Sequence, residues 1–115
     1  MRTIIAGSRS ITDIQYIRDA IEFSGFEITK VISGAAKGVD YLGELWAAEN
    51  NIFTELYPAQ WERYGRGAGF KRNALMATKA DALIAVWDGK SSGTHHMIQM
   101  ANNLGLKVFI YKVDL

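Results

Sequence analysis

Short apolar runs alternate with stretches of helical periodicity along this chain. The apolar runs have the length and composition of β-strands and lie at residues 2–6, 29–33, 52–57, 82–87 and 107–112. Between them, apolar residues recur at helical spacing over residues 12–24, 38–50, about 68–79 and about 93–104. Regular alternation of strand and helix is typical of a parallel sheet with helices on both faces. The pattern therefore predicts an α/β fold.

The succession of elements narrows this prediction to a three-layer Rossmann-like (flavodoxin-like) sandwich. Its core would be a parallel five-stranded sheet in the order 3-2-1-4-5, with right-handed crossovers between the strands. The first and fourth strands would then be neighbours at a topological switch point. Open sheets of this kind bind ligands at that point, outside the carboxyl ends of the strands.

Individual residues indicate where the helices begin, end and pack. Thr12 and Gln15 have the spacing of a capping box, and Gly25 fits the end of the same helix. One face of the last helix is expected to be buried, and it consists of Met97, Met100, Ala101 and Leu104.

Composition favours one domain over residues 1–115 and excludes several chemistries. The chain has no cysteine, which excludes disulfides, thiolate metal sites and a cysteine nucleophile and fits the reducing cytoplasm. No apolar run approaches the ~20 residues of a membrane span. The net charge of +1 offers no general attraction to nucleic acid or to anionic lipid. No residue spacing suggests a bound metal, and no cofactor is expected.

Glycine-containing loops follow the predicted strands, and two of them flank the switch point. The first has Gly7, Ser8 and Arg9; the other is rich in hydroxyls and contains Ser91, Ser92, Gly93 and Thr94. A glycine lets the backbone approach a phosphate, and a helix N-terminus offers free N–H groups with a positive dipole end. An ordinary turn and a helix cap are the alternative interpretations. The sequence predicts a site for an anionic, nucleotide-like ligand.

The loop after the second strand is the most distinctive stretch of the sequence. Its small residues would let a ligand approach, and its candidate ligand-binding residues are Gly34, Ala35, Lys37, Gly38 and Asp40. Asp40 also suits a helix N-terminus without any further role. Glu44 follows one turn later on the same helix face, so the two could present paired carboxylates. The candidate catalytic residues are Asp40, Glu44 and Asp88, with Glu62 a further acid.

Aromatic and basic residues interleave in the long loop after the third strand and the helix that follows. Trp61, Tyr64 and Phe70 alternate with Arg63, Arg66, Lys71 and Arg72. Such a mixture can stack a base and hold phosphates. Packing of the aromatic rings on the core is the alternative, and it is the interpretation we favour for Trp61.

The basic side chains and the histidines give two further expectations. We expect Arg9, Lys37 and Arg72 to face one pocket. His95 and His96 are adjacent and diverge by roughly 100° on a helix, so they should not bind one metal together.

The motifs in order resemble the SLOG superfamily, which includes the DNA-processing protein A and LOG families, and a small single-domain bacterial and phage branch of it most of all. They read Gly7-Ser8-Arg9, Gly34-Ala35-Ala36-Lys37-Gly38-Val39-Asp40 with Trp46, Pro58-Ala59-Gln60-Trp61, Ala68-Gly69-Phe70-Lys71-Arg72-Asn73 and Gly93-Thr94. The resemblance implies binding of a nucleotide or nucleotide-derived molecule and adds Arg72 and Asn73 to the candidate site. LOG enzymes cleave an N-glycosidic bond with a glutamate, and Met97 stands at that position here.

Three functions follow from these observations. The leading one is sensing or sequestering of a nucleotide-derived ligand, such as an ADP-ribose-like molecule or a cyclic nucleotide. The alternatives are an N-glycosidase acting on a nucleoside 5′-monophosphate and a nucleic-acid-binding accessory protein. Binding without turnover is favoured because methionine supplies neither a charge nor a proton. A homodimer or higher homo-oligomer is expected, because the tryptophans and the late methionines would leave apolar surface to cover.

Overall fold

The computed structural model describes residues 1–115, whose five parallel strands form one sheet in the order β3-β2-β1-β4-β5. The strands are β1 (Arg2–Gly7), β2 (Lys30–Ser33), β3 (Phe53–Leu56), β4 (Ala82–Trp87) and β5 (Lys107–Lys112). Both the parallel pairing and the strand order are those predicted from the sequence. β1 and β4 pair in the middle of the sheet, with Ile4 opposite Leu83 and Gly7 opposite Val86.

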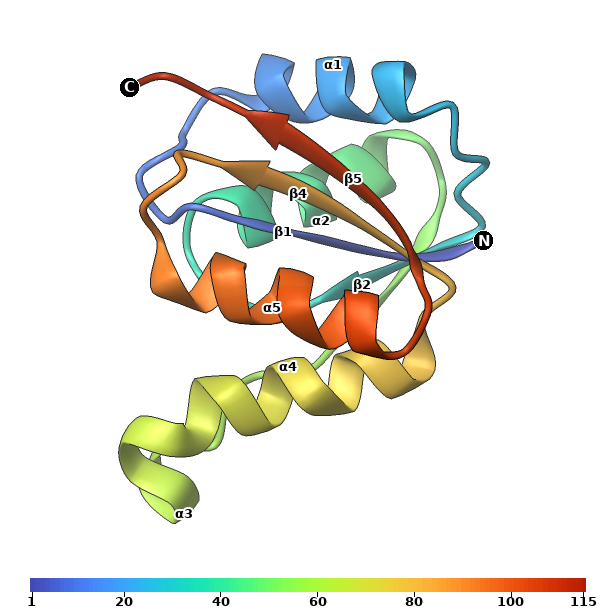
Figure 1. Ribbon diagram of the computed structural model, residues 1–115. Helices are drawn as coiled ribbons and strands as arrows, with labels where there is room; N and C mark the ends of the chain where they lie inside the picture. The colour runs from blue at the N-terminus through green and yellow to red at the C-terminus, as the bar shows by residue number, and fades with distance from the viewer.

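Helices cover both faces of the sheet (Figure 1). α1 (Ile14–Ser24) and α2 (Val39–Glu49) pack on one face, and α4 (Ala68–Lys79) and α5 (Ser92–Asn103) pack on the other. The stretch predicted as a loop contains a one-turn helix, α3 (Trp61–Tyr64), and a 3₁₀ turn, η1 (Gly65–Gly67). The three-layer prediction is confirmed. None of the helices has the length and apolarity needed to cross a membrane.

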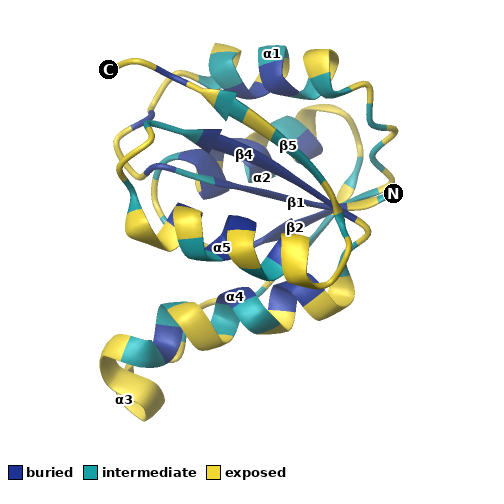
Figure 2. Cartoon of the chain, in the orientation of Figure 1, coloured by how far each residue is buried: buried dark blue, intermediate teal, exposed yellow.

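The apolar core has two halves, one on each side of the sheet. Ile5 and Ile84 belong to the half beneath α1 and α2, whereas Ile4 and Leu83 belong to the half above α4 and α5. Successive strand residues point to opposite faces, so a strand buried on both faces needs a continuous apolar run. β1 and β4 meet this requirement and are dark blue along most of their length in Figure 2.

Two local expectations were wrong. α1 begins at Ile14, and its N-cap is Asp13, whose carboxylate accepts a hydrogen bond from the Gln15 amide at 2.9 Å. An aspartate caps a helix as well as a threonine does, so the capping box on Thr12 does not form.

In the last helix Met97 and Ala101 are buried, but Leu104 is 55% exposed because the helix ends at Asn103 and the chain turns away. Gly25 ends α1 in the left-handed conformation (φ 69°).

Gly7 ends β1 at the point where the backbone of β4 comes closest. A Cβ added there would lie 1.9 Å from the carbonyl oxygen of Val86. We predict that Gly7→Ala lowers the free energy of unfolding by about 3 kcal/mol or more, because a backbone atom of the central sheet cannot move aside. Urea denaturation would measure the effect.

Gly93→Ala is the matched control for this substitution. Nothing lies within 4 Å of a Cβ added at Gly93, in the first turn of α5. The control should leave stability unchanged or raise it by up to about 1 kcal/mol. Equal effects of the two alanines on stability would contradict this account of Gly7.

Candidate functional site

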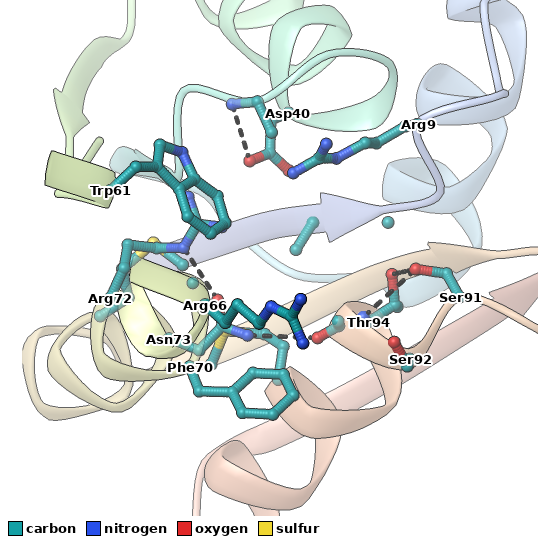
Figure 3. A pocket seen from close by; sticks show the side chains of 17 residues that line it. Arg9, Asp40, Trp61, Arg66, Phe70, Arg72, Asn73, Ser91, Ser92 and Thr94 are labelled. Atoms are coloured by element: carbon teal, nitrogen blue, oxygen red, sulfur yellow. Dashed lines mark hydrogen bonds between the residues drawn. The ribbon is translucent and has the colours of Figure 1, made fainter. Parts of the chain in front are cut away.

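A cleft of about 280 Å³ opens at the carboxyl end of the sheet. Its walls come from the end of β1, the beginning of α2, the α3–α4 region and the N-terminus of α5 (Figure 3). Nine residues proposed from the sequence line it: Gly7, Arg9, Asp40, Arg72, Asn73, Ser91, Ser92, Gly93 and Thr94. The loops after the first, second and fourth strands therefore meet in one cavity.

Other candidates lie outside the cleft lining. They are Ser8, Gly34, Ala35, Lys37, Gly38, Glu44 and Asp88. The expectation that Lys37 faces the cavity with Arg9 and Arg72 was therefore wrong for Lys37, which is exposed on the β2–α2 loop away from the lining. Ser8 is buried, and its hydroxyl accepts a hydrogen bond from the Asp88 amide at 3.0 Å. Gly38 packs against the backbone of Arg9.

Asp88 shapes the loop that leads into α5. Its carboxylate accepts hydrogen bonds from the amides of Lys90 and Ser91 at 2.8 and 2.9 Å. These bonds hold the pKa of Asp88 below its usual value. The Asp88 amide also donates to the Ser8 hydroxyl, so Asp88 helps to hold the loop that carries the N-terminus of α5.

The N-terminus of α5 presents unbonded amides to the cleft. Ser91 is the N-cap, and its hydroxyl oxygen is 3.4 Å from the Thr94 amide and 3.1 Å from the Thr94 hydroxyl. The amides of Ser92 and Gly93 belong to the first turn, where a helix supplies no acceptor. A negative charge placed there would meet N–H donors and the positive end of the helix dipole.

Arg72 links α4 to the loop after β2. Its guanidinium donates to the carbonyl oxygen of Gly34, and its Nε donates to the side-chain oxygen of Asn73 at 3.0 Å. A Cβ at Gly34 would lie 2.8 Å from an Asp40 carboxylate oxygen and closer still to the guanidinium. Glycine is therefore needed where the arginine and the aspartate converge. Burial lowers the pKa of Arg72 below its usual value.

Asp40 is an acid enclosed among cations. It is 6% exposed, and its Oδ2 accepts a hydrogen bond from the Ala36 amide at 3.2 Å. Burial raises the pKa of Asp40 to about 6, and Glu44 adds to the rise; the Ala36 bond, Arg72 and Arg9 oppose it. Glu44 lies beside the cleft and accepts a bond from the Ser33 hydroxyl at 2.7 Å. Of the predicted carboxylate pair, only Asp40 lines the cavity.

Asn73 joins α4 to α5. Its side-chain nitrogen donates to the carbonyl oxygen of Gly93 at 3.1 Å and lies 3.2 Å from Nδ1 of His96. The His96 ring stacks on Phe70 with ring centroids 4.2 Å apart, and burial lowers its pKa. His95 stacks instead on Trp87, so the two histidines have different partners. No cluster of residues in the chain is arranged to hold a metal ion.

Part of the cleft wall was not predicted from the sequence. Arg66 and Phe70 line it, and Trp61 is 52% exposed at the same cavity with its ring edge 3.5 Å from the Cβ position of Gly69. The interpretation that Trp61 packs on the core was wrong. The interleaving of basic and aromatic residues was the available signal, but the turns α3 and η1 that bring them to the cleft were not predicted. Neither Arg9 nor Arg66 takes part in a salt bridge.

Comparison with known proteins gives the class of this domain, which is SLOG. The chain belongs to the YspA, cpYpsA-related SLOG family, whose sequence profile matches residues 1–64. It is 33% identical to the Gene 61 protein of Mycobacterium phage D29 over an alignment of 117 positions that covers 93% of each chain.

A solved structure shares the fold. DNA processing protein A from Streptococcus pneumoniae matches with a TM-score of 0.70 and 21% identity over 95% of this chain. The match covers 49% of that protein, so this chain spans about half of its length. At this level of identity the likeness establishes the three-layer architecture alone.

The pKa of Asp40 gives a stability prediction. A carboxyl whose pKa is about 6 when folded, against an ordinary 3.8, binds its proton more tightly in the folded state. The wild-type protein should therefore lose stability as the pH rises from about 4 to about 6. Asp40→Asn removes this loss and keeps an oxygen for the Ala36 amide. Above about pH 6 the variant should be more stable by about 1–3 kcal/mol.

Urea denaturation across this pH range checks the prediction. The difference between variant and wild type should shrink toward zero below about pH 4, where the carboxyl is protonated in both states. An Asp40→Asn protein that is less stable than wild type at neutral pH would contradict the assigned cost of burying this charge.

Proposed function

We propose that this protein binds a nucleotide or a nucleotide-derived ligand and holds its phosphate at the N-terminus of α5. One observation carries the proposal: the unbonded amides of that helix share a cleft with Arg9 and Arg66, which form no salt bridge. Helix amides and guanidinium groups are the usual partners of phosphate oxygens in proteins. The cleft thus contains three arginines, Arg9, Arg66 and Arg72, and a single acid, Asp40.

The strand order supports an orientation for the ligand. Trp61 follows β3, Asp40 follows β2, Arg9 follows β1 and the α5 N-terminus follows β4, in the order in which these strands lie in the sheet. Neighbouring strands are about 4.8 Å apart, so the row spans roughly 14 Å. A nucleotide would fill this row with its phosphate at the β4 end, its sugar in the middle and its base near Trp61. Stacking on exposed aromatic rings suits any base.

The size of the cleft favours a mononucleotide body. A volume of about 280 Å³ lies near the lower end of the range of small-molecule pockets, roughly 300–1,000 Å³. An ADP-ribose-like molecule or a cyclic dinucleotide would have to extend beyond the walls, past the exposed rings of Trp61 and Phe70.

Hydrolysis of an N-glycosidic bond is the second candidate function, and Asp40 favours it. A carboxylate whose pKa is about 6 in a ligand cleft can take a proton from water as the water oxygen attacks C1′. The bond from C1′ to the base nitrogen then breaks, and the departing base takes a proton from solvent. Met97 argues for binding alone. It is buried and lines the cleft, where its thioether can neither donate a proton nor stabilise a positive charge.

A nucleic-acid-binding role is the third candidate. The DNA processing protein A of Streptococcus pneumoniae shares the fold, and that protein is named for DNA processing. In this chain Arg9, Arg66 and Arg72 line one small cleft, and the net charge is only +1. Binding to a single strand that weakens steeply with salt would support this role.

Self-association is also proposed, but on a different surface from the one suggested by the sequence. Met97 is buried and Met100 half-buried, so that helix leaves little apolar surface. Phe53, Leu56 and Leu75 are exposed along the β3 edge and α4. A two-fold dimer would cover them. Light scattering at micromolar concentration tests this, and a monomer mass would count against it.

Arg9→Ala tests the phosphate site. A guanidinium–phosphate contact is worth on the order of 1.5–3 kcal/mol, so affinity should fall roughly tenfold or more. Arg63→Ala is the matched control, because it loses the same charge on α3 beside the cleft without lining it. Calorimetry with nucleoside mono- and diphosphates, ADP-ribose and cyclic dinucleotides measures the affinities. Equal losses in the two variants would remove Arg9 from the site.

Incubation of the protein with the same nucleotides separates binding from hydrolysis. If the protein only binds, mass spectrometry recovers each nucleotide intact. Release of free base by the wild type that disappears in Asp40→Asn would establish the enzyme and overturn the binding proposal.

A further inference from the structure

Asp40 has one carboxylate oxygen that the protein does not use. Oδ2 accepts the hydrogen bond of the Ala36 amide, and Oδ1 has no hydrogen-bond partner within the chain. No fully enclosed side-chain oxygen or nitrogen in this structure lacks a partner, so Oδ1 is open to the cleft that Asp40 lines. Asp40 is only 6% exposed, yet one of its carboxylate oxygens has no hydrogen-bond partner in the chain at the cleft that the residue lines.

This acceptor is out of place in a site for anions. Arg9, Arg66 and Arg72 line the same cleft and attract phosphate, whereas a carboxylate repels it. Stabilisation of the α2 N-terminus does not explain the burial, because an exposed carboxylate serves a helix dipole without a desolvation cost. The partner of Oδ1 should therefore be a neutral hydrogen-bond donor on the ligand.

The position of Asp40 in the row of strand ends selects that donor. β2 lies between β3, which leads to Trp61, and β1, which leads to Arg9. With phosphate at α5 and the base near Trp61, the part of a nucleotide opposite β2 is the sugar. The donors of a ribose are its 2′ and 3′ hydroxyls, and acidic side chains bind them in other Rossmann-like sites.

We propose that Asp40 accepts a hydrogen bond from a ribose hydroxyl and makes the cleft selective for ribonucleotides over deoxyribonucleotides. This inference rests on the proposed nucleotide-binding function and goes beyond it, because phosphate and base contacts alone would accept both sugars. A site built around a hydrogen bond to a hydroxyl rejects the analogue that lacks it, since the buried polar group is left unpaired. Asp40 is then a specificity-determining residue of the cleft.

Sugar analogues test the inference directly. The tightest binder among AMP, GMP, CMP and UMP is compared with its 2′-deoxy and 3′-deoxy forms by calorimetry at about pH 7.5. The wild type should bind at least one deoxy form about tenfold or more weakly than the ribonucleotide. In Asp40→Asn the oxygen stays with the Ala36 amide and an NH₂ group faces the cleft, so the preference should fall below about threefold.

Glu44→Gln is the matched control. It removes the other acid one turn along α2, whose carboxylate bonds to Ser33 and lies outside the cleft lining. The preference for ribose should persist in this variant. Circular dichroism of each variant establishes that a lost preference reflects the side chain and not unfolding.

A pH series adds a second readout. The charged groups around Asp40 are Arg72, Arg9 and Glu44, and only the last of these is another acid. The ribose preference should weaken as the pH falls through about 6, because a protonated carboxyl is a weaker acceptor. The preference is a ratio of two affinities for the same phosphate group, so titration of the phosphate cancels. Glu44→Gln should keep a pH dependence whose midpoint lies at lower pH, because Glu44 adds to the rise in the pKa of Asp40, and Asp40→Asn should show none.

The possible failures are distinguishable. Equal affinity for the ribo and both deoxy forms overturns the inference and leaves nucleotide binding standing. A ribose preference that persists in Asp40→Asn, or a preference that follows the base and not the sugar, also overturns it. Absence of binding to every nucleotide tested refutes the proposed function and the inference together.

Discussion

The pairing of β1 with β4 determines where this molecule can hold a ligand. The chain leaves β1 for α1 on one face of the sheet and leaves β4 for α5 on the other face. Two neighbouring strands thus send their following segments in opposite directions, and the space between them stays open. The close contact of Gly7 with the Val86 carbonyl draws the two strand ends together beneath that opening. The position of the cleft follows from the strand order, and the side chains determine only its lining.

A short polar network then fixes the distance between the walls of the cleft. Arg72 reaches from α4 to the Gly34 carbonyl at the end of β2, and its neighbour Asn73 reaches from the same helix to the Gly93 carbonyl at the start of α5. Asn73 also orients Arg72 through a bond to its Nε. Two consecutive residues of one helix therefore tie together the loops that follow β2 and β4. Both bonds have backbone acceptors, and the bond to Gly34 also requires that this position carry no side chain.

Periodicity was sufficient to predict the architecture but not the lining of the cleft. Apolar runs such as residues 82–87 are typical of strands buried on both faces of a parallel sheet, and the strand order is that of the Rossmann-like class that the alternating elements predicted. The glycine and hydroxyl residues after β1 and β4 also predicted two walls of the cleft, because their loops follow neighbouring strands at the same edge of the sheet. Lys37 was assigned to the cavity because it belongs to a loop that reaches it, yet a sequence does not tell which way a loop side chain points.

The helices α3 and η1 were not predicted from the sequence, because they are too short to show a periodic pattern. Four-residue helices have too few positions to show a period, so the stretch before α4 read as a loop. Its turns place Trp61 and Arg66 at the cleft, whereas the tryptophan was expected to pack on the core. Similarly, Asp13 rather than Thr12 caps α1, because either residue can serve and the choice depends on where the chain enters the helix.

The groups of the cleft differ in how they respond to solvent, and that difference assigns them separate roles. Arg9 and Arg66 are exposed, so their attraction for an anion is screened by salt and carries little geometric information. The α5 amides have fixed directions, and Asp40 is buried and held by the Ala36 amide. Low local polarity strengthens a bond that is made and penalises one that is missing. The exposed arginines would therefore govern how readily an anion arrives, whereas the fixed amides and the buried acid would decide which molecule stays.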